Sequence, residues 1–163
     1  ENGGVYLLDE LDAADPNLLL VINTALANGY CNLPNRTAKP KAVKHDDFIP
    51  IATANTFGKG GNRQYVGRSQ LDESTLDRFR IGTVECDYDP GVERHLCPNG
   101  DLLEKCWEIR KKIVDSGLRR VLSTRFIQDA YIMNSIAKWD IEKIVTVFLE
   151  GWTAEEKAKV LSA

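Results

Sequence analysis

The sequence predicts an α/β fold, in which part of a parallel sheet with flanking helices is followed by a small all-helical part. Short apolar runs without polar alternation lie near residues 5–8, 48–54 and 81–87. Such runs are typical of strands that are buried on both faces of a parallel sheet. Helical patterns separate the runs, and only helical patterns remain after about residue 100. We therefore expect about three parallel strands and then a group of helices.

The boundary between the two parts is expected where turn signals are concentrated. An Asp-Pro-Gly triplet and a Pro-Asn-Gly triplet both lie between residues 89 and 100. We assign residues 1–92 to the α/β part and residues 93–163 to the helical part.

The composition is that of an ordinary globular chain. The 163 residues are 43% hydrophobic and 28% charged, with 21 basic and 24 acidic residues and a net charge of −3. This balance excludes disordered and collagen-like chains, and the negative charge argues against a nucleic-acid partner held by bulk electrostatics. No apolar run approaches the roughly 20 residues that cross a bilayer. Because no basic leader segment is present, we expect neither a membrane partner nor export.

The cysteines and histidines do not follow a metal-binding pattern. A zinc site needs about four ligands at short, paired spacings, and no such spacing occurs in the chain. Reduced thiols are favoured instead, which fits a cytoplasmic protein. The residues concerned are Cys31, Cys86, Cys97, Cys106, His45 and His95.

The first predicted strand, residues 5–8, lies close to the start of the chain. Because a central strand needs neighbours and covering helices, we expect that the first part of this domain is missing from the chain. A helix follows, with Asp15 as its cap and Pro16 in its first turn. Asn28 and Gly29 are expected to end this helix.

The remaining elements follow from composition and spacing. Residues 30–48 are polar and contain two prolines and three lysines, which predicts a hairpin or an exposed loop. A second buried strand ends at Asn55, and a short helix over residues 72–79 precedes a third strand over residues 81–88. The later helices are expected at 101–116, 123–137, 139–150 and 153–162.

Two carboxylates follow the first predicted strand. Asp9 and Glu10 come directly after the apolar run, at the strand end where ligands bind in parallel sheets. An aspartate there can hold Mg²⁺, and a glutamate beside it can orient and polarise a water. The alternative is a solvated acidic turn.

Three other polar residues occupy positions that chemistry could use. Asn55 ends the second strand, although a turn-forming asparagine is also common there. Arg78 ends the short helix, where a solvated surface charge is the alternative. Arg125 lies in the first turn of a helix that Ser123 can cap, and a cation is unfavourable at that end of the helix dipole.

The order and spacing of these segments resemble the AAA+ ATPases, a class of P-loop NTPases. The sequence looks most like the branch with MoxR-type proteins, the ATPase subunits of cobalt and magnesium chelatases, and dynein- and midasin-like modules. The resemblance covers nearly the whole chain and weakens after about residue 138. The matching motifs are Walker B (5–10), the pre-sensor 1 hairpin (30–48), sensor 1 (51–56), the L-x-x-x-x-L-D-R-F segment with its arginine finger (71–79) and sensor 2 (122–125).

One family motif is absent from the sequence. No G-x-x-x-x-G-K-[S/T] segment occurs, and the glycines at 58–61 follow sensor 1 rather than precede Walker B. We therefore expect the chain to be the C-terminal portion of a longer ATPase, starting just before Walker B.

The resemblance implies ATP and Mg²⁺ as cofactors and assigns roles to four residues. Asp9 would hold Mg²⁺, and Glu10 would act on the catalytic water. Asn55 would hydrogen-bond the water or the γ-phosphate. Arg125 would contact the phosphates from the helical lid of the same subunit.

The resemblance also implies a homo-oligomeric ring, a hexamer in this family. Arg78 would reach into the neighbouring subunit as the arginine finger, a role worth ~10³–10⁵ in rate. Arg68 and Arg80 are the alternatives for this role. The expected activity is ATP-driven remodelling of a client protein, such as a VWA-domain or chelatase-type partner.

Two further alternatives remain at this point. The hairpin lysines and Tyr30 could contact a substrate in the pore of a ring, or they could simply be solvated. The whole domain could also be a scaffold or interaction domain that kept the AAA+ architecture without hydrolysing ATP.

Overall fold

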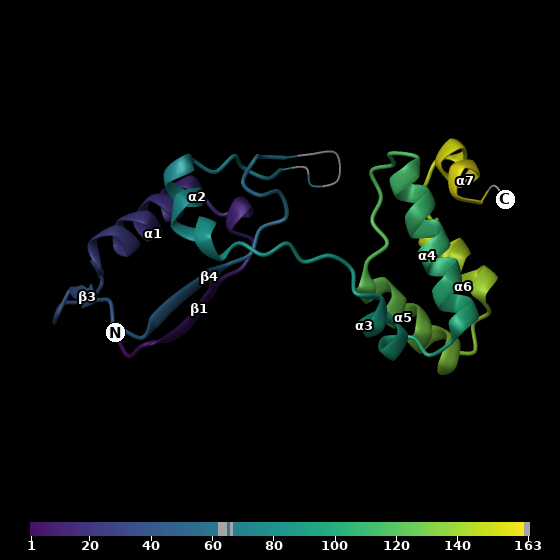
Figure 1. Cartoon of the computed structure of the whole chain (residues 1–163), viewed down its shortest axis with the longest axis horizontal. Coiled ribbons are helices and arrows are strands. Elements are labelled where there is room, and N and C mark those ends of the chain that lie inside the picture. The colour runs from purple at the N-terminus through teal and green to yellow at the C-terminus, as the bar shows by residue number, and fades with distance from the viewer. Residues whose placement is uncertain (62–64, 66, 162–163) are drawn as a thin grey trace. The chain divides into compact units, whose positions relative to one another are not determined.

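The computed structural model describes residues 1–61, 65 and 67–161. The chain is an α/β protein that divides into two compact units, Glu1–Val84 and Glu85–Ala163 (Figure 1). We call them the first unit and the second unit. In the described residues, no helix has both the length and the apolar character that crossing a bilayer requires.

A small parallel sheet forms the centre of the first unit. Strand β1 (Gly4–Leu8) pairs in parallel with β4 (Phe48–Ala52), in a register that joins Gly4 to Phe48 and Leu8 to Ala52. The predicted parallel pairing of the first two strands is confirmed. Both strands therefore end at the same edge of the sheet.

The prediction of a third strand over residues 81–88 is wrong. Residues Arg80–Gly82 form a short 3₁₀ turn, η2, and residues 83–89 have no regular structure. Ile81 is fully exposed. A strand needs a neighbour that accepts and donates its backbone hydrogen bonds, and no described strand offers one to this segment.

The expectation that β1 is buried on both faces is also wrong. Val5 and Leu7 are 65% and 55% exposed, and Ile49 and Ile51 on the paired strand are exposed as well. Because alternate residues of a strand share a face, these four side chains form one uncovered apolar sheet face.

Helix α1 (Pro16–Asn28) connects β1 to a hairpin. The Asp15 carboxylate accepts a hydrogen bond from the Asn17 backbone N–H at 2.7 Å, and Gly29 ends the helix in a left-handed conformation. The chain then forms β2 (Tyr30–Asn32) and β3 (Lys41–Val43), which pair antiparallel. Of the two alternatives predicted for residues 30–48, a hairpin or an exposed loop, the structure shows a hairpin.

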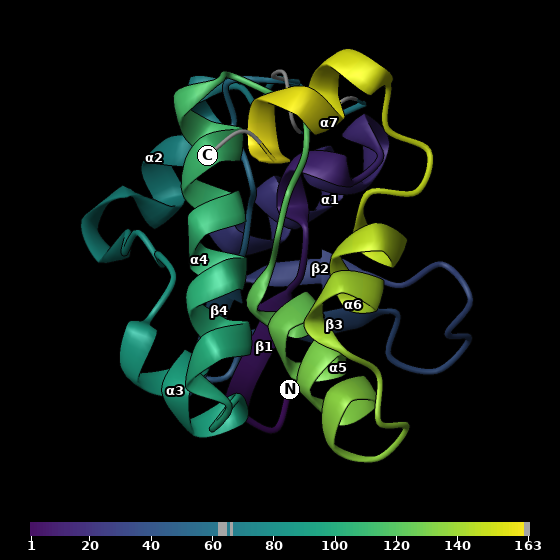
Figure 2. The ribbon, with the colours of Figure 1, turned by 90° about the vertical axis from the view of Figure 1, so that its right-hand side faces the viewer.

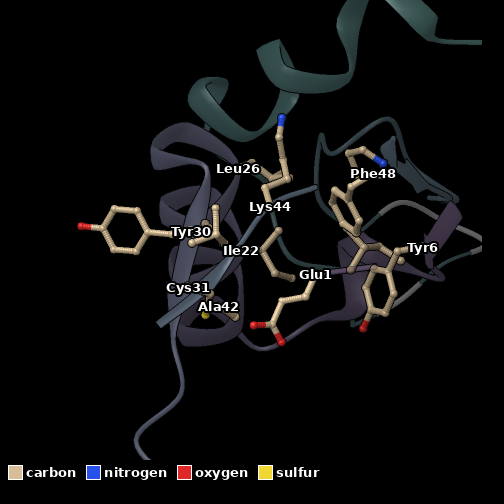
Figure 3. A pocket seen from close by; sticks show the side chains of 13 residues that line it. Glu1, Tyr6, Ile22, Leu26, Tyr30, Cys31, Ala42, Lys44 and Phe48 are labelled. Atoms are coloured by element: carbon tan, nitrogen blue, oxygen red, sulfur yellow. The ribbon is translucent and has the colours of Figure 1, made fainter. Parts of the chain in front are cut away.

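The opposite sheet face borders a groove of about 320 Å³ between the sheet, α1 and the hairpin (Figure 3). Tyr6 and Phe48 line it from the sheet, and Ile22 and Leu26 line it from α1. Figure 3 shows these four side chains facing one another across the groove. Its lining is mostly apolar. Tyr30 and Lys44, from the hairpin residues considered for substrate contact, belong to the lining, whereas Asp9, Glu10, Asn55, Arg78 and Arg125 do not.

The second unit is helical throughout. Helices lie at all four predicted places: α4 (Gly100–Asp115), α5 (Thr124–Ser135), α6 (Ile141–Phe148) and α7 (Ala154–Leu161). Residue 162, the last of the predicted final helix, lies outside the described residues. Helix α4 packs against α5 and α7, and α5 packs against α6 (Figure 2).

An additional helix, α3 (Pro90–Leu96), was not predicted. The Asp89 carboxylate caps it by accepting from the Gly91 backbone N–H at 2.7 Å, and Pro90 occupies its first turn. Asp-Pro is a helix-start signal as well as a turn signal, so the sequence did contain the information. Helix α3 packs against α4 and α5. The second compact unit begins at Glu85, whereas the sequence suggests a boundary at 92/93.

The core of the second unit follows from helical spacing. Leu102, Cys106, Ile109 and Ile113 recur three or four residues apart on α4, and all four are buried. They pack with apolar residues from the other helices. The other buried members of this core are Cys97, Leu103, Leu122, Ile127, Ala130, Ile144, Leu149, Trp152 and Val160.

Candidate functional site

The two predicted carboxylates and the predicted asparagine lie at one edge of the sheet. Asp9 and Glu10 follow β1, and Thr53 and Asn55 follow β4, so the parallel pairing brings all four to the same edge. The Thr53 hydroxyl donates to the Asp9 carboxylate, and the Glu10 backbone N–H donates to the Thr53 hydroxyl at 3.0 Å. Thr53, which was not among the predicted site residues, therefore links the two strand ends. We call this region the acidic edge.

Glu10 has an unusual backbone conformation. Its φ and ψ angles are 53° and 47°, in the left-handed region that few residues other than glycine adopt. The following 3₁₀ turn, η1 (Leu11–Ala13), is held by a hydrogen bond from the Leu11 N–H to the Thr53 carbonyl at 2.8 Å. Such a conformation persists only where the surroundings fix it, and these bonds do so.

Asp12 is the central polar residue beneath the acidic edge. It is fully buried, and its Oδ2 accepts from the Asn55 backbone N–H at 3.1 Å and from the Thr56 hydroxyl at 2.7 Å. Its backbone carbonyl accepts from the Ser69 N–H at 2.8 Å. Asp12 therefore ties the segment after β4 and the segment around Ser69 to the end of β1. Nothing in the local sequence marks it, because its partners lie more than 40 residues away.

Arg68 lies at the acidic edge of its own chain. Its Nη1 and Nη2 donate to the two carboxylate oxygens of Glu10 at 3.2 and 3.1 Å, and its Nη1 lies 3.5 Å from Oδ1 of Asp12. The hydrogen bond with Glu10 raises the pKa of Arg68 above its ordinary value. Arg68 was an alternative for the arginine finger, but here it pairs within the molecule.

Arg78 extends from α2 (Glu73–Phe79) and is held by a buried polar network. Its Nε donates to Oδ1 of Asn23 at 3.2 Å, and the Asn23 amide donates to the Thr75 hydroxyl at 2.6 Å. Asn23 and Thr75 are buried, whereas Arg78 is exposed. Among the described residues, the terminal nitrogens of Arg78 have no hydrogen-bond partner.

Arg80, the other alternative for the finger, is paired along its own helix. Its Nη2 lies 2.7 Å from the Glu73 carboxylate, and its Nε lies 3.8 Å from that of Asp77. Of the three arginines, Arg78 therefore combines a fixed Nε with terminal nitrogens that no described residue occupies.

Arg125 belongs to the second unit, whereas the other predicted site residues belong to the first. It is exposed in the first turn of α5, and no described residue pairs with it. The predicted cap is confirmed, because the Ser123 hydroxyl accepts from the Phe126 N–H at 3.2 Å. The neighbouring Thr124 hydroxyl donates to Glu93 at 2.7 Å, which fixes the start of the helix.

Glu93 forms a buried ion pair inside the second unit. Its carboxylate accepts from the Arg110 guanidinium at 2.6 and 2.9 Å and from the Trp107 indole at 2.6 Å. Burial alone would raise the pKa of Glu93, but the hydrogen bonds from Arg110, Thr124 and Trp107 outweigh it and hold the pKa below its ordinary value. No pattern in the sequence predicted this network, because Glu93 and its partners are 14 to 31 residues apart.

The acidic edge offers one exposed carboxylate, that of Asp9, to a metal ion whose other ligands would have to come from a bound phosphate and water. In the described part of the chain, no group of three or more His, Cys, Asp or Glu side chains could bind a metal. Mg²⁺ in phosphate sites, however, needs only one or two carboxylates in addition to phosphates and water. Asp9 is exposed, and its Oδ2 accepts no hydrogen bond from the described residues, so it could supply one ligand.

Comparisons of this chain with family models, curated proteins and solved structures find no match. The functional interpretation therefore depends on the geometry of the site and on the order of the motifs.

Proposed function

We propose that the chain is part of an AAA+ ATPase of the MoxR or chelatase type, which couples ATP hydrolysis to remodelling of a partner protein. The parallel pairing of β1 with β4 is the observation that carries this proposal. It brings Asp9, Glu10 and Asn55 to one sheet edge, as nucleotide hydrolysis at such an edge requires.

Each residue of the acidic edge has a distinct part in this reaction. Asp9 would hold Mg²⁺, which neutralises phosphate charge when bound. Glu10, whose side chain is 57% exposed, would polarise the attacking water. The Asn55 side chain is exposed and has no described partner, so its amide can orient the water or bind a phosphate oxygen.

Two arginines would act on the nucleotide, one from a neighbouring subunit and one from the same subunit. Arg78 would act in the site of the neighbouring subunit of a homo-oligomeric ring, because its terminal nitrogens remain available. Arg125, exposed at the start of α5, would contact the phosphates of its own subunit. The proposal also requires a phosphate-binding loop, which the 163 residues do not contain.

The decisive experiment measures ATP hydrolysis by the protein expressed from its complete reading frame. Glu10→Gln keeps the size of the side chain and removes its charge, so we expect turnover to fall by about 10²-fold or more while ATP binding persists. The matched control is Glu104→Gln, an exposed glutamate of α4 without a described partner. Equal turnover in both variants and the wild type would remove Glu10 from catalysis and favour the non-hydrolysing scaffold.

A mixing experiment tests Arg78. Arg78→Ala should lower turnover, and added Glu10→Gln subunits should restore part of it, because they supply an intact arginine to the catalytic site of the mutant. If mixing restores nothing, Arg78 does not act across a subunit boundary.

Nucleotide binding by the 163-residue chain provides an independent check. Most phosphate contacts in such enzymes come from the absent loop, and each lost charge-assisted hydrogen bond costs roughly 1.5–3 kcal/mol. We therefore expect a millimolar or weaker Kd for Mg-ATP in isothermal titration. A micromolar Kd would show that the chain binds nucleotide by another site.

A further inference from the structure

Asn23 is a polar residue on the buried face of α1. Its exposed fraction is 8%, and Leu19, one turn earlier on the same face, is 7% exposed. An apolar residue is the usual choice at such a position, because a buried amide is unfavourable unless its hydrogen bonds are satisfied. Both ends of the Asn23 amide do have partners, and both partners, Thr75 and Arg78, belong to α2.

The hydrogen bonds of α2 determine which end of the amide faces which partner. The Thr75 hydroxyl donates to Oδ1 of Asp72 at 3.2 Å, so its oxygen is left to accept from Nδ2 of Asn23, at 2.6 Å. Oδ1 of Asn23 then faces Nε of Arg78 and accepts from it at 3.2 Å. The reverse orientation would place the amide N–H against the Nε–H of Arg78, which are two donors without an acceptor. The amide therefore has one favoured orientation, with its oxygen towards Arg78.

The other end of this chain of hydrogen bonds is anchored at Asp72, the cap of α2. Its Oδ1 also accepts from the Ser74 hydroxyl at 2.6 Å and from the Thr75 backbone N–H at 2.8 Å. The Ser74 bond, followed by that from the Thr75 N–H, lowers the pKa of Asp72 below its ordinary value. The start of α2 therefore fixes Thr75, and through Thr75 it fixes Asn23.

Arg78 is held at one of its three nitrogens. Its Nε donates to Asn23, whereas Nη1 and Nη2 have no hydrogen-bond partner among the described residues. Because the guanidinium is planar, a fixed Nε restricts the directions in which the other two nitrogens can point. Less conformational freedom is then lost when these nitrogens bind a ligand. A pair of guanidinium nitrogens matches two oxygens of a phosphate group.

We propose that Asn23 is a positioning residue, which fixes Nε of Arg78 and thereby presents Nη1 and Nη2 to phosphate oxygens. The inference rests on the proposed function, in which Arg78 acts on a nucleotide in the neighbouring subunit. Asn23 itself would contact neither the nucleotide nor the attacking water. It acts through Arg78.

The first test measures proton exchange at Nε of Arg78 by nitrogen-15 NMR of the 163-residue chain. The signals of Arg78 and Arg125 are assigned by their loss in Arg78→Lys and Arg125→Lys. Arg125, which is exposed and has no described partner, is the internal reference. We expect exchange at Arg78 to be about tenfold slower, the factor for one hydrogen bond of ordinary strength. Equal rates at the two arginines would overturn the proposal, and this comparison requires no folded variant of Asn23.

Two variants then separate the hydrogen bond from the packing of Asn23. Asn23→Leu keeps the size of the side chain but removes the acceptor, so exchange at Arg78 should rise to the Arg125 rate. Asn23→Asp keeps an acceptor and adds a charge, so exchange at Arg78 should stay slow. Asn28→Leu, the same change at an exposed position of α1 without a described partner, is the matched control and should leave the rate unchanged. Slow exchange in Asn23→Leu, or fast exchange in Asn23→Asp with an unaltered circular dichroism spectrum, would overturn the proposal.

The second test uses ATP hydrolysis by the complete protein. Asn23→Leu should lower kcat by about tenfold with little change in KM, because Arg78 would act in the transition state. The double variant with Arg78→Ala should be no slower than Arg78→Ala alone, since Asn23 acts only through Arg78. A further loss in the double variant would indicate a merely structural role and would overturn the proposal. A complete protein that hydrolyses no ATP would refute the proposed function but would not change the exchange rates, so the two failures are distinguishable.

Discussion

The two units of the molecule are stabilised in different ways. The second unit has a continuous core of buried apolar side chains from its helices. In the first unit, the buried apolar cluster consists of Leu11, Leu19 and Leu71, while the strands expose one apolar face. There, long-range hydrogen bonds around Asp12 and Thr53 hold the segments together.

This difference indicates where the molecule is rigid and where it can move. An apolar core resists local opening, whereas segments held by a few polar contacts open at lower free energy. The residues of the acidic edge are all on segments of the second kind. The candidate catalytic residues of the acidic edge therefore lie where local rearrangement costs least.

The largest effect is expected from Glu93→Gln, which removes the ion pair between Glu93 and Arg110 in the second unit. The change leaves the Arg110 guanidinium, which is only 14% exposed, without a counter-charge, so the second unit should lose about 3 kcal/mol of stability. All three tryptophans lie in this unit, and tryptophan fluorescence during urea unfolding therefore reports on it alone. Glu104→Gln is the control and should shift the midpoint very little. A Glu93→Gln midpoint equal to that of the control would show that the ion pair is not a stabilising element.

The next largest effect is expected from Asp12→Ala in the first unit. The change leaves the Asn55 N–H and the Thr56 hydroxyl without their acceptor, at a cost of about 2 kcal/mol. Hydrogen exchange should accelerate at the Ser69 amide, which donates to the Asp12 carbonyl. The control is Asp46→Asn, an exposed aspartate without a described partner. Unchanged exchange at Ser69 would mean that Asp12 does not organise this unit.

A smaller effect concerns the exposed sheet face, which should make the chain associate at high concentration. Val5→Thr places a hydroxyl on this face and should weaken association by about tenfold in sedimentation experiments. Val114→Thr is a matched control in the second unit, because Val114 is 66% exposed and Val5 is 65% exposed. If the chain stays monomeric, or if both variants weaken association equally, the sheet face is not the contact surface.

The smallest effect is expected on the thermal stability of the second unit at acidic pH. Hydrogen bonds from Arg120 lower the pKa of Glu156 to about 2, and those from Lys105 and Lys112 lower the pKa of Glu108 to about 2, against an ordinary value of 4.5. Because the folded pKa is depressed, this stabilisation is present above about pH 4.5 and is lost as the pH falls towards 2. The thermal midpoint of the second unit should fall across this window, and Glu156→Gln should make the fall shallower. An identical pH dependence in Glu156→Gln and the wild type would contradict the assignment.

Local patterns predicted the elements whose cause is local. Asp15, Asp72 and Ser123 cap their helices because a side-chain oxygen reaches a backbone N–H two or three residues later. The parallel pairing of β1 and β4 also followed from two apolar runs separated by a helix. The edge position of Asp9, Glu10 and Asn55 is a direct consequence of that pairing.

The wrong predictions and the residues that were not predicted have one physical cause. Each depends on contacts between segments that are distant in the sequence. Residues 81–88 carry a strand-like pattern, but a strand also needs a partner, and propensity cannot supply one. Asp12 lies in an unremarkable turn sequence, and its importance arises only when Thr56 and Arg68 are folded against it. The assignment of Arg68 to Glu10 likewise depends on a long-range contact that no spacing rule encodes.

The hydrogen bonds of Arg78 and Thr75 with Asn23 also connect α2 to α1. Arg78 holds Asn23 in the middle of α1, and Thr75 holds the same asparagine from α2. Helix α1 ends at Gly29, which leads directly into the hairpin strand β2, and the Gly29 carbonyl also accepts from the Lys44 N–H at 2.7 Å. These hydrogen bonds therefore connect the Arg78 side chain through α1 to both strands of the hairpin, so a change in the partners of Arg78 would act on the helix from which the hairpin extends.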